Sequence, residues 1–318
     1  MPMSNFPNGF SGGVAIRGMP ILNTHSGNVF WVDSGSGSNG NNGTYGQPFA
    51  TVDYTIGRCT ASNGDTIMVA PGHVETIAAA GGVTVDVAGV TIIGLGNGAS
   101  RPTFNFTATA STYIVTAADH VVSNCLFTGG IDAVVTMFTI SGADCAILNC
   151  ETRDVTGQMT SCITTATGAD RLLIDGYTHR GAAAAGGVNC LELVGADDGV
   201  TVRNFWIDGN FSTAAIQNVT GVMTNLSIYG DQQCFLRTRN AADVAITLVA
   251  TSTGNLGPNI NMRLQDNAAN IDECIVGAAM NYYLPLNVVN LQNEYPFGTT
   301  AVGGIGIPGA ARAASTDA

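Results

Sequence analysis

Apolar and polar residues alternate along this chain in short runs, and the runs recur at a nearly constant spacing. One submotif places an aliphatic residue or Met two positions before an Asn or Asp. Its five copies are centred on Asn124, Asn149, Asp175, Asn204 and Asn225, which follow one another at roughly equal intervals. We expect these residues to form a structural ladder at one turn, because Asn tolerates the left-handed backbone region and stacked amides can bond one another.

A second series of residues repeats at a similar interval. It consists of the pairs Ala118-Asp119, Ala143-Asp144, Ala169-Asp170 and Ala196-Asp197. Each period of about 25 residues therefore holds two or three short strands between turns, with no stretch long enough for a crossover helix. Strands that recur in this way stack on their own copies, which predicts an all-β parallel β-helix, or solenoid. The leucine spacing of leucine-rich repeats and the blade signatures of propellers are absent.

The repeat divides the chain into four segments. We expect an N-terminal arm at 1–30, an initial loop and capping helix at 31–60, the β-helix at 61–298 and a flexible Gly/Ala tail at 299–318. The segment 48–57 predicts a short amphipathic helix, with Thr51 as its N-cap and with Val52 and Ile56 on one face. Such a helix would close the open end of the solenoid.

Composition narrows the possible partners. Charged residues make up only 11%, Gly occurs 41 times, and the net charge is −12. The basic residues are all Arg and form no cluster in the sequence, so neither nucleic acid nor an anionic membrane is expected as a partner. No apolar run approaches the roughly 20 residues of a membrane span. The N-terminus lacks the features of a signal peptide, and the eight Cys are expected to be reduced and buried.

Candidate catalytic groups are sparse. The adjacent pair Asp197-Asp198 falls in the turn series, which favours a solvated turn over a pair of catalytic carboxylates. Glu151, Arg153 and Asp154 alternate, and we interpret them as a surface salt bridge on one coil. The four His have no metal-ligand spacing. We therefore expect no catalytic residue, no metal site, no cofactor and no enzymatic activity.

The N-terminal third carries a resemblance to a known fold family. Its motifs are Val32-Asp33-Ser34, Pro48-Phe49-Ala50-Thr51, Gly64-Asp65-Thr66-Ile67 and Pro71-Gly72-His73-Val74-Glu75-Thr76. They resemble the first segment of pectate-lyase-like right-handed β-helix proteins, in particular glycine-rich β-helix proteins of tailed bacteriophages, over roughly residues 29–280. The resemblance implies a right-handed coil and a structural role in a virion. The Asn-Thr-Asp, Gly-His-Gly and Arg-x-Lys segments of polygalacturonase-like relatives are missing.

These observations lead to one main functional expectation and two alternatives. The main one is a capsid decoration (cement) protein, a homotrimer on the outer surface of the virion that is assembled in the host cytoplasm and binds the major capsid protein through its arm. The expected capsid contacts are Phe6, Phe10, Ile16, Arg17, Met19 and Ile21, which can bury apolar surface on a partner. The alternatives are a tail fibre or baseplate β-helix that binds host glycans, and a tailspike that depolymerises polysaccharide.

Overall fold

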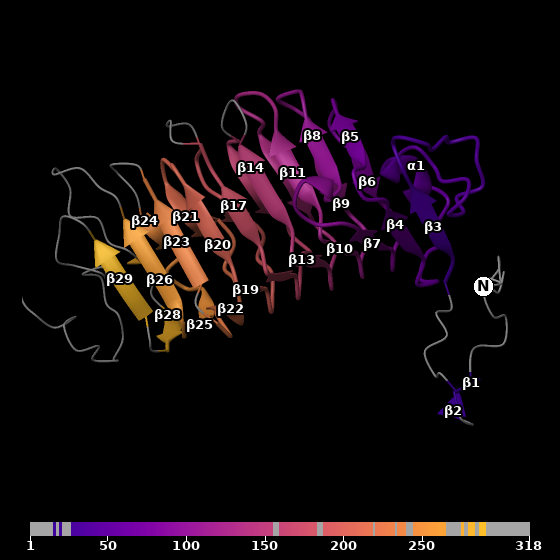
Figure 1. Cartoon of the computed structure of the whole chain (residues 1–318). Coiled ribbons are helices and arrows are strands. Elements are labelled where there is room, and N and C mark those ends of the chain that lie inside the picture. Colours follow the sequence, from indigo (N-terminus) through magenta and orange to yellow (C-terminus); the bar gives the residue numbers. More distant parts are fainter. Residues whose placement is uncertain are drawn as a thin grey trace, which may run out of the picture.

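The computed structural model describes residues 15–16, 19–20, 27–154, 159–182, 187–218, 220–232, 234–239, 244–264, 275–276, 279–283 and 286–290. Successive coils stack along one axis from β3 at one end to β29 at the other (Figure 1). The predicted parallel β-solenoid is confirmed, and its coil is of the right-handed type. Among the described residues no helix is long and apolar enough to cross a membrane.

Three parallel sheets form the walls of the solenoid. The ten-stranded sheet contains β3 (Val29–Val32), β4 (Thr66–Val69), β7 (Thr91–Gly94), β10 (Val121–Ser123), β13 (Ala146–Leu148), β16 (Leu173–Asp175), β19 (Thr201–Arg203), β22 (Leu226–Tyr229), β25 (Thr253–Leu256) and β28 (Ala279–Tyr282). The nine-stranded sheet contains β5 (Val74–Ile77), β8 (Thr103–Phe106), β11 (Leu126–Gly129), β14 (Glu151–Asp154), β17 (Thr178–Arg180), β20 (Trp206–Gly209), β23 (Cys234–Thr238), β26 (Ile260–Leu264) and β29 (Leu286–Asn290). The eight-stranded sheet contains β6 (Val83–Val85), β9 (Tyr113–Val115), β12 (Thr136–Ile140), β15 (Ser161–Thr165), β18 (Leu191–Leu193), β21 (Ala214–Asn218), β24 (Val244–Thr247) and β27 (Ile275–Val276).

Strand register gives the length of a coil. The ten-stranded sheet pairs Val122, Ile147, Ile174, Val202, Ile228 and Leu256 in succession, each with the next. A coil contains ~27 residues, so it is slightly longer than the repeat in the sequence suggested. Its length varies because the turns between strands differ in length, while the strands themselves keep their alternation of inward and outward side chains.

Because the coil length varies, the expected Asn/Asp ladder is only partly correct: Asp175 and Asn225 do not occupy the same turn position as Asn124, Asn149 and Asn204. One turn, between the ten-stranded and the nine-stranded sheets, has a residue with positive φ in successive coils: Asn124, Asn149, Gly176 and Asn204, and later Asn259. Asp175 lies one position earlier, inside β16, because it pairs with Leu148. It still contacts the series, since Asn204 Nδ2 donates to Asp175 Oδ1 at 2.9 Å.

Asn225 belongs to a different turn, which precedes the ten-stranded sheet. The positive-φ residues of that turn are Ser62 and Gly64 in the first coil, followed by Gly89, Asp119, Asp144, Arg171, Gly199 and Asn225. Asp119 and Asp144 were aligned correctly by the sequence, whereas Arg171 and Gly199 take the positions that had been given to Asp170 and Asp197. Residue type alone gave the wrong alignment at these positions, because Asn, Asp and Gly are all compatible with a left-handed turn.

The first coil begins earlier in the chain than expected. β3 pairs with β4, so the ten-stranded sheet starts at Val29 rather than near residue 61. The predicted helix is present as α1 (Val52–Ile56), with Val52 and Ile56 buried, but Thr51 makes no side-chain capping bond. Instead, Glu75 Oε2 on β5 accepts the Val52 N–H at 2.9 Å. A carboxylate from the sheet therefore ties the helix to the first coil. A 3₁₀ turn, η1 (Gly98–Ser100), follows β7.

Much of the expected arm and the whole tail lie outside the described residues. Phe6, Phe10, Arg17 and Ile21 are among them, as is the segment 299–318. Ile16 and Met19 pair with each other in the short antiparallel strands β1 (Ala15–Ile16) and β2 (Met19–Pro20). The expected capsid contacts stay predictions.

Candidate functional site

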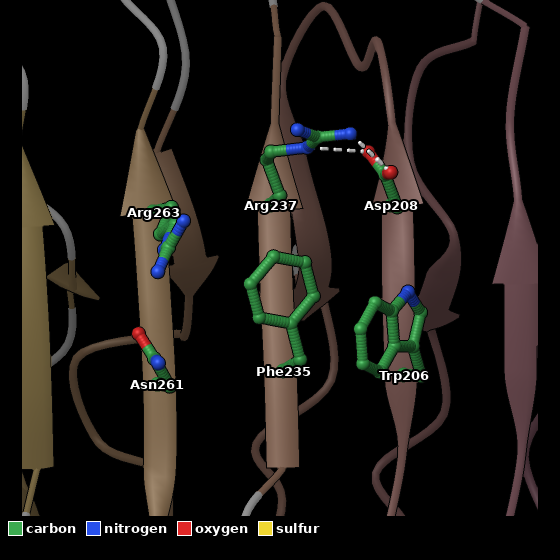
Figure 2. Close-up of a pocket in the computed structure, with 6 residues that line it drawn as sticks. All are labelled: Trp206, Asp208, Phe235, Arg237, Asn261 and Arg263. Carbon is green, nitrogen blue, oxygen red and sulfur yellow. Dashed lines mark hydrogen bonds and ion pairs between the residues drawn. The ribbon is translucent and has the colours of Figure 1, made fainter.

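The outward side of β14, β17, β20, β23 and β26, which we call the lateral face, brings together two rows of side chains. Register places Glu151, Thr178, Trp206, Phe235 and Asn261 in one row. The parallel row, two positions further along each strand, contains Arg153, Arg180, Asp208, Arg237 and Arg263. Figure 2 shows Trp206, Phe235 and Asn261 side by side, with Asp208, Arg237 and Arg263 above them.

Aromatic side chains form an exposed platform at the centre of this face. The Trp206 side chain is 52% exposed, and its ring lies 4.6 Å from the Phe235 ring at an interplanar angle of 34°. The Arg263 guanidinium lies 5.6 Å from the centre of the Phe235 ring. Exposing a Trp ring to this extent contributes little to the stability of the fold, because much of its apolar surface stays in water.

Two ion-pair networks hold the charged row in place. Asp208 accepts hydrogen bonds from Arg237 Nε at 2.8 Å and from Arg239 Nη2 at 2.8 Å. Glu151 pairs with Arg153 at 2.6 Å, with Arg180 at 3.2 Å and with Arg101. The Glu151–Arg153 part of the expected salt bridge is thus confirmed and extends across neighbouring coils, whereas Asp154 accepts the backbone N–H groups of Met159 and Ala182.

The lateral face is basic within an acidic protein. Six of the eleven arginines lie on it or at its edge, against two carboxylates: Arg101, Arg153, Arg180, Arg237, Arg239 and Arg263, with Glu151 and Asp208. The described residues show no ion pair for Arg263 with a carboxylate. The sequence suggested that no basic cluster exists because these arginines are far apart in the chain. Stacking of successive coils brings them together on one wall.

Both carboxylates are held in the ionised form. Burial alone would raise the pKa of Asp208, but hydrogen bonds from Arg237 and Arg239 outweigh it and lower the pKa. The same balance holds at Glu151. Burial alone would raise its pKa, but hydrogen bonds from Arg153 and Arg101 outweigh burial, so the pKa is lowered. Neither group is suited to donate a proton at neutral pH, which is the task of the acid in glycoside hydrolysis.

Two adjoining hollows lie on this face. One is lined by Trp206, Asp208, Phe235, Arg237, Asn261 and Arg263. The other is lined by Thr178, Arg180, Gly181, Trp206, Asp208 and Arg239. Because they share Trp206 and Asp208, they form one continuous track across β17, β20, β23 and β26, and its lining offers aromatic, guanidinium and carboxylate groups to a ligand.

The other acidic candidates lie elsewhere. Asp197 is fully buried and accepts the N–H groups of Gly168 and Ala169 at 2.9 and 3.1 Å, so the expected solvated turn is wrong for it. Asp198 is exposed and accepts hydrogen bonds from Thr224 and Asn225 on the next coil. The two adjacent carboxylates face different surroundings and do not form a pair around a substrate.

The interior of the solenoid holds a cluster that the sequence analysis missed. Cys162, His179 and Cys190 are buried, and their ligand atoms all lie within 4.8 Å of one another. His73 and His120 are also buried. The available signal was the separation of Cys162 and Cys190 along the chain, which equals one coil.

Comparison with known proteins adds no relative to this description. No protein-family model matches the chain, and neither a curated protein nor a solved structure matches it. The right-handed parallel β-solenoid is therefore established by the strand pairing of this chain, and its function has to be argued from the lateral face and the interior.

Proposed function

We propose that this protein is a non-enzymatic β-helix that binds an acidic polysaccharide along its lateral face. The observation that carries the proposal is the pair of the exposed Trp206 ring and the half-buried Phe235 ring beside a row of guanidinium groups. This is one of the two alternatives raised by the sequence, a glycan-binding β-helix that does not cut its ligand.

The chemistry of the track matches a sugar acid. The apolar face of a sugar ring packs on the flat surface of Trp or Phe, and Arg recognises a carboxylate through two parallel N–H groups. Arg263 offers its guanidinium beside Phe235, while Asp208 and Glu151 can accept hydrogen bonds from sugar hydroxyls. A polymer with one carboxylate per sugar supplies each of these partners.

The direction of the rows matches an extended chain. Neighbouring strands stack along the solenoid axis, so each row runs parallel to that axis. Four strands at the usual spacing of about 4.8 Å span about 14 Å, which accommodates a few linked sugar residues. A polysaccharide would therefore lie along the solenoid and cross one strand after another.

Charge disfavours a nucleic acid as the ligand. A nucleic acid presents a dense line of phosphates, and binding it depends on neutralising many of them. On the lateral face the six arginines are accompanied by Glu151 and Asp208, and the chain as a whole carries −12. A polymer with a lower charge density and many hydroxyls suits such a mixed surface better.

The non-enzymatic part of the proposal rests on the two carboxylates of the face. Their lowered pKa values keep Glu151 and Asp208 ionised, so neither is the protonated acid that hydrolysis needs. Capsid decoration, the main expectation from the sequence, depends on arm residues outside the described part of the chain, so the lateral face neither supports nor opposes it.

The proposal is tested by titrating the full chain with polygalacturonate and alginate oligosaccharides, with neutral dextran as the comparison. The chain has two Trp, and Trp31→Phe leaves Trp206 as the fluorescent reporter. We expect Trp206 emission to change with the acidic sugars and not with dextran. Trp206→Ala, whose binding is measured by isothermal titration calorimetry because it lacks the reporter, should weaken binding about tenfold, since a lost aromatic contact is worth roughly 1.4 kcal/mol.

Arginine variants separate the lateral face from general charge. Arg263→Ala should weaken binding and reduce its dependence on salt, whereas Arg203→Ala, on the ten-stranded sheet, should leave both unchanged. Equal affinity of the wild type and Trp206→Ala would contradict the proposal. Tighter binding of a single-stranded oligonucleotide would assign the face to nucleic acid, and release of reducing ends or unsaturated sugars would make the protein an enzyme.

A further inference from the structure

The buried Cys-His cluster is formed by two strands and one turn residue of successive coils. Cys162 lies in β15, and Cys190 directly precedes β18 on the next coil. Because Ile163 pairs with Leu191, the two Cys are stacked at equivalent positions. His179, at the centre of β17, projects inward from the adjoining wall, and its Nδ1 lies 3.3 Å from Cys162 Sγ.

We propose that Cys162, His179 and Cys190 form a buried structural metal site for Zn²⁺. The three side chains are at most 2% exposed, and their sulfur and nitrogen atoms lie within 4.8 Å of one another. Zinc binds thiolate at about 2.3 Å and imidazole at about 2.0 Å in a tetrahedron, which requires the ligand atoms to be about 3.5–3.8 Å apart. The cluster is therefore close to zinc geometry without rearrangement of the coils.

Charge balance also favours a dipositive ion here. Two thiolates and a neutral imidazole carry −2, so Zn²⁺ makes the buried group electrically neutral. Two further oxygen atoms line the cluster. The Tyr177 hydroxyl lies 3.5 Å from Cys190 Sγ, and Thr152 Oγ1 lies 2.9 Å from His179 Nδ1. Tyr177 is placed to supply a fourth ligand atom, whereas Thr152 bonds the same imidazole nitrogen that faces Cys162, so binding of the ion at that nitrogen would displace this hydrogen bond.

A second stacked Cys pair provides a matched comparison. Cys125 and Cys150 occupy equivalent positions on neighbouring coils, because Leu126 pairs with Glu151, and both are buried. Their thiols lie near the backbone carbonyls of Ser123 and Val122, at 3.4 and 3.7 Å. In the part of the chain that the structure describes, Cys162 and Cys190 are joined by a third ligand group, His179, whereas Cys125 and Cys150 have no third ligand beside them. Stacking of Cys alone therefore does not create the site.

A Cys beside a His can also be a catalytic nucleophile and its base. A nucleophile must reach a substrate, and all three side chains lie inside the solenoid wall. Burial is instead typical of structural zinc sites, in which the ion is taken up as the chain folds. The site would then tie together the coils that contain β14, β15, β17 and β18.

The test is to produce the full chain in zinc-supplemented medium, remove any affinity tag, purify it under reducing conditions and measure bound metal by mass spectrometry. We expect about one Zn²⁺ per chain in the wild type and in Cys125→Ala/Cys150→Ala. Cys162→Ser/Cys190→Ser should contain at least about tenfold less zinc, as should His179→Gln.

A cobalt spectrum keeps the proposal testable if these variants do not fold. Refolding the wild type with Co²⁺ should give the thiolate charge-transfer and tetrahedral ligand-field bands, unchanged in Cys125→Ala/Cys150→Ala. Folded wild-type protein without zinc, or without those cobalt bands, would overturn the proposal. So would equal zinc content in Cys162→Ser/Cys190→Ser, or a Cys162–Cys190 disulfide detected in the protein purified without reductant.

Discussion

Two fully buried histidines, His120 and His179, show how differently neighbouring parts of one solenoid are built. His120 donates from Nδ1 to the Val90 carbonyl at 2.8 Å and accepts at Nε2 from the Tyr113 hydroxyl at 3.1 Å. Burial lowers its pKa to about 4, which keeps it neutral. Burial would also lower the pKa of His179, but the charge of Cys162 and its hydrogen bond raise it. The two histidines are equally buried, so the opposite directions of their pKa shifts come from their neighbours.

The cores around the two histidines differ in the same way. Beside His120 the interior is aromatic: the Phe104 and Phe127 rings are stacked at 5.1 Å, and Tyr113 and Phe138 pack against them. One coil further, Thr152 takes the position of Phe127, and His179 follows it. The comparison teaches that the repeat fixes where a side chain points, while each coil uses that position for packing or for polar chemistry.

The largest expected effect is on the aromatic core. Phe127→Ala should lower the free energy of unfolding by about 3–5 kcal/mol, because it leaves a cavity between Phe104 and Phe138. Urea denaturation followed by circular dichroism measures this, with Trp206→Ala on the lateral face as the control that should cost less than about 1 kcal/mol. A loss as small for Phe127→Ala would mean that the two regions are packed to a similar degree.

His120 should contribute one component of the pH dependence of stability, opposite in sign to that of Asp154, whose pKa burial raises to about 6. The pKa of His120 is about 4 in the fold against 6.5 in the unfolded chain, so the unfolded state binds more protons between these values. The stabilising contribution is complete above pH 6.5 and decreases as the pH falls towards 4, by about 3 kcal/mol. His120→Gln keeps a donor and an acceptor but does not titrate. Subtracting its stability curve from that of the wild type should isolate this decrease; parallel curves would show that His120 is not the source.

The smallest effects concern two buried hydroxyls that contact the histidines. Thr152→Val removes a group that bonds both Tyr177 and His179, and should cost about 1–3 kcal/mol. Tyr113→Phe removes one bond to His120 and should cost less, about 1 kcal/mol. Thermal unfolding of both variants checks the order, and a larger cost for Tyr113→Phe would reverse the assignment of the more polar network to His179.

Several features of the fold could be predicted because they depend on local chemistry. Asn124, Asn149 and Asn204 recur where the backbone needs a left-handed residue, so the type of turn is visible in the sequence. Val52 and Ile56 lie on one face of a short helix for the same local reason. The cap of that helix was missed because it comes from Glu75, which is distant in the chain and on another element.

The lateral face and the Cys-His cluster were missed for one physical reason. Trp206 and Phe235 stand one coil apart, and so do Cys162 and Cys190. Because the turns vary in length, one coil is not a fixed number of residues. Aligning the sequence on a constant period therefore puts residues that are stacked in the structure at different positions of the repeat. Only the hydrogen-bond register between strands, which absorbs the variable turns, aligns them.

The sequence by itself determined that this chain is a parallel solenoid, because alternation sets which side chains face inward and recurrence requires each coil to pair with the next. Only the tertiary structure decided which outward residues form a row and which inward residues meet across the interior. His179 reaches Cys162 and Cys190 from a different wall, and no spacing along the chain encodes contacts across the interior. Those contacts follow from how three walls close around a shared core.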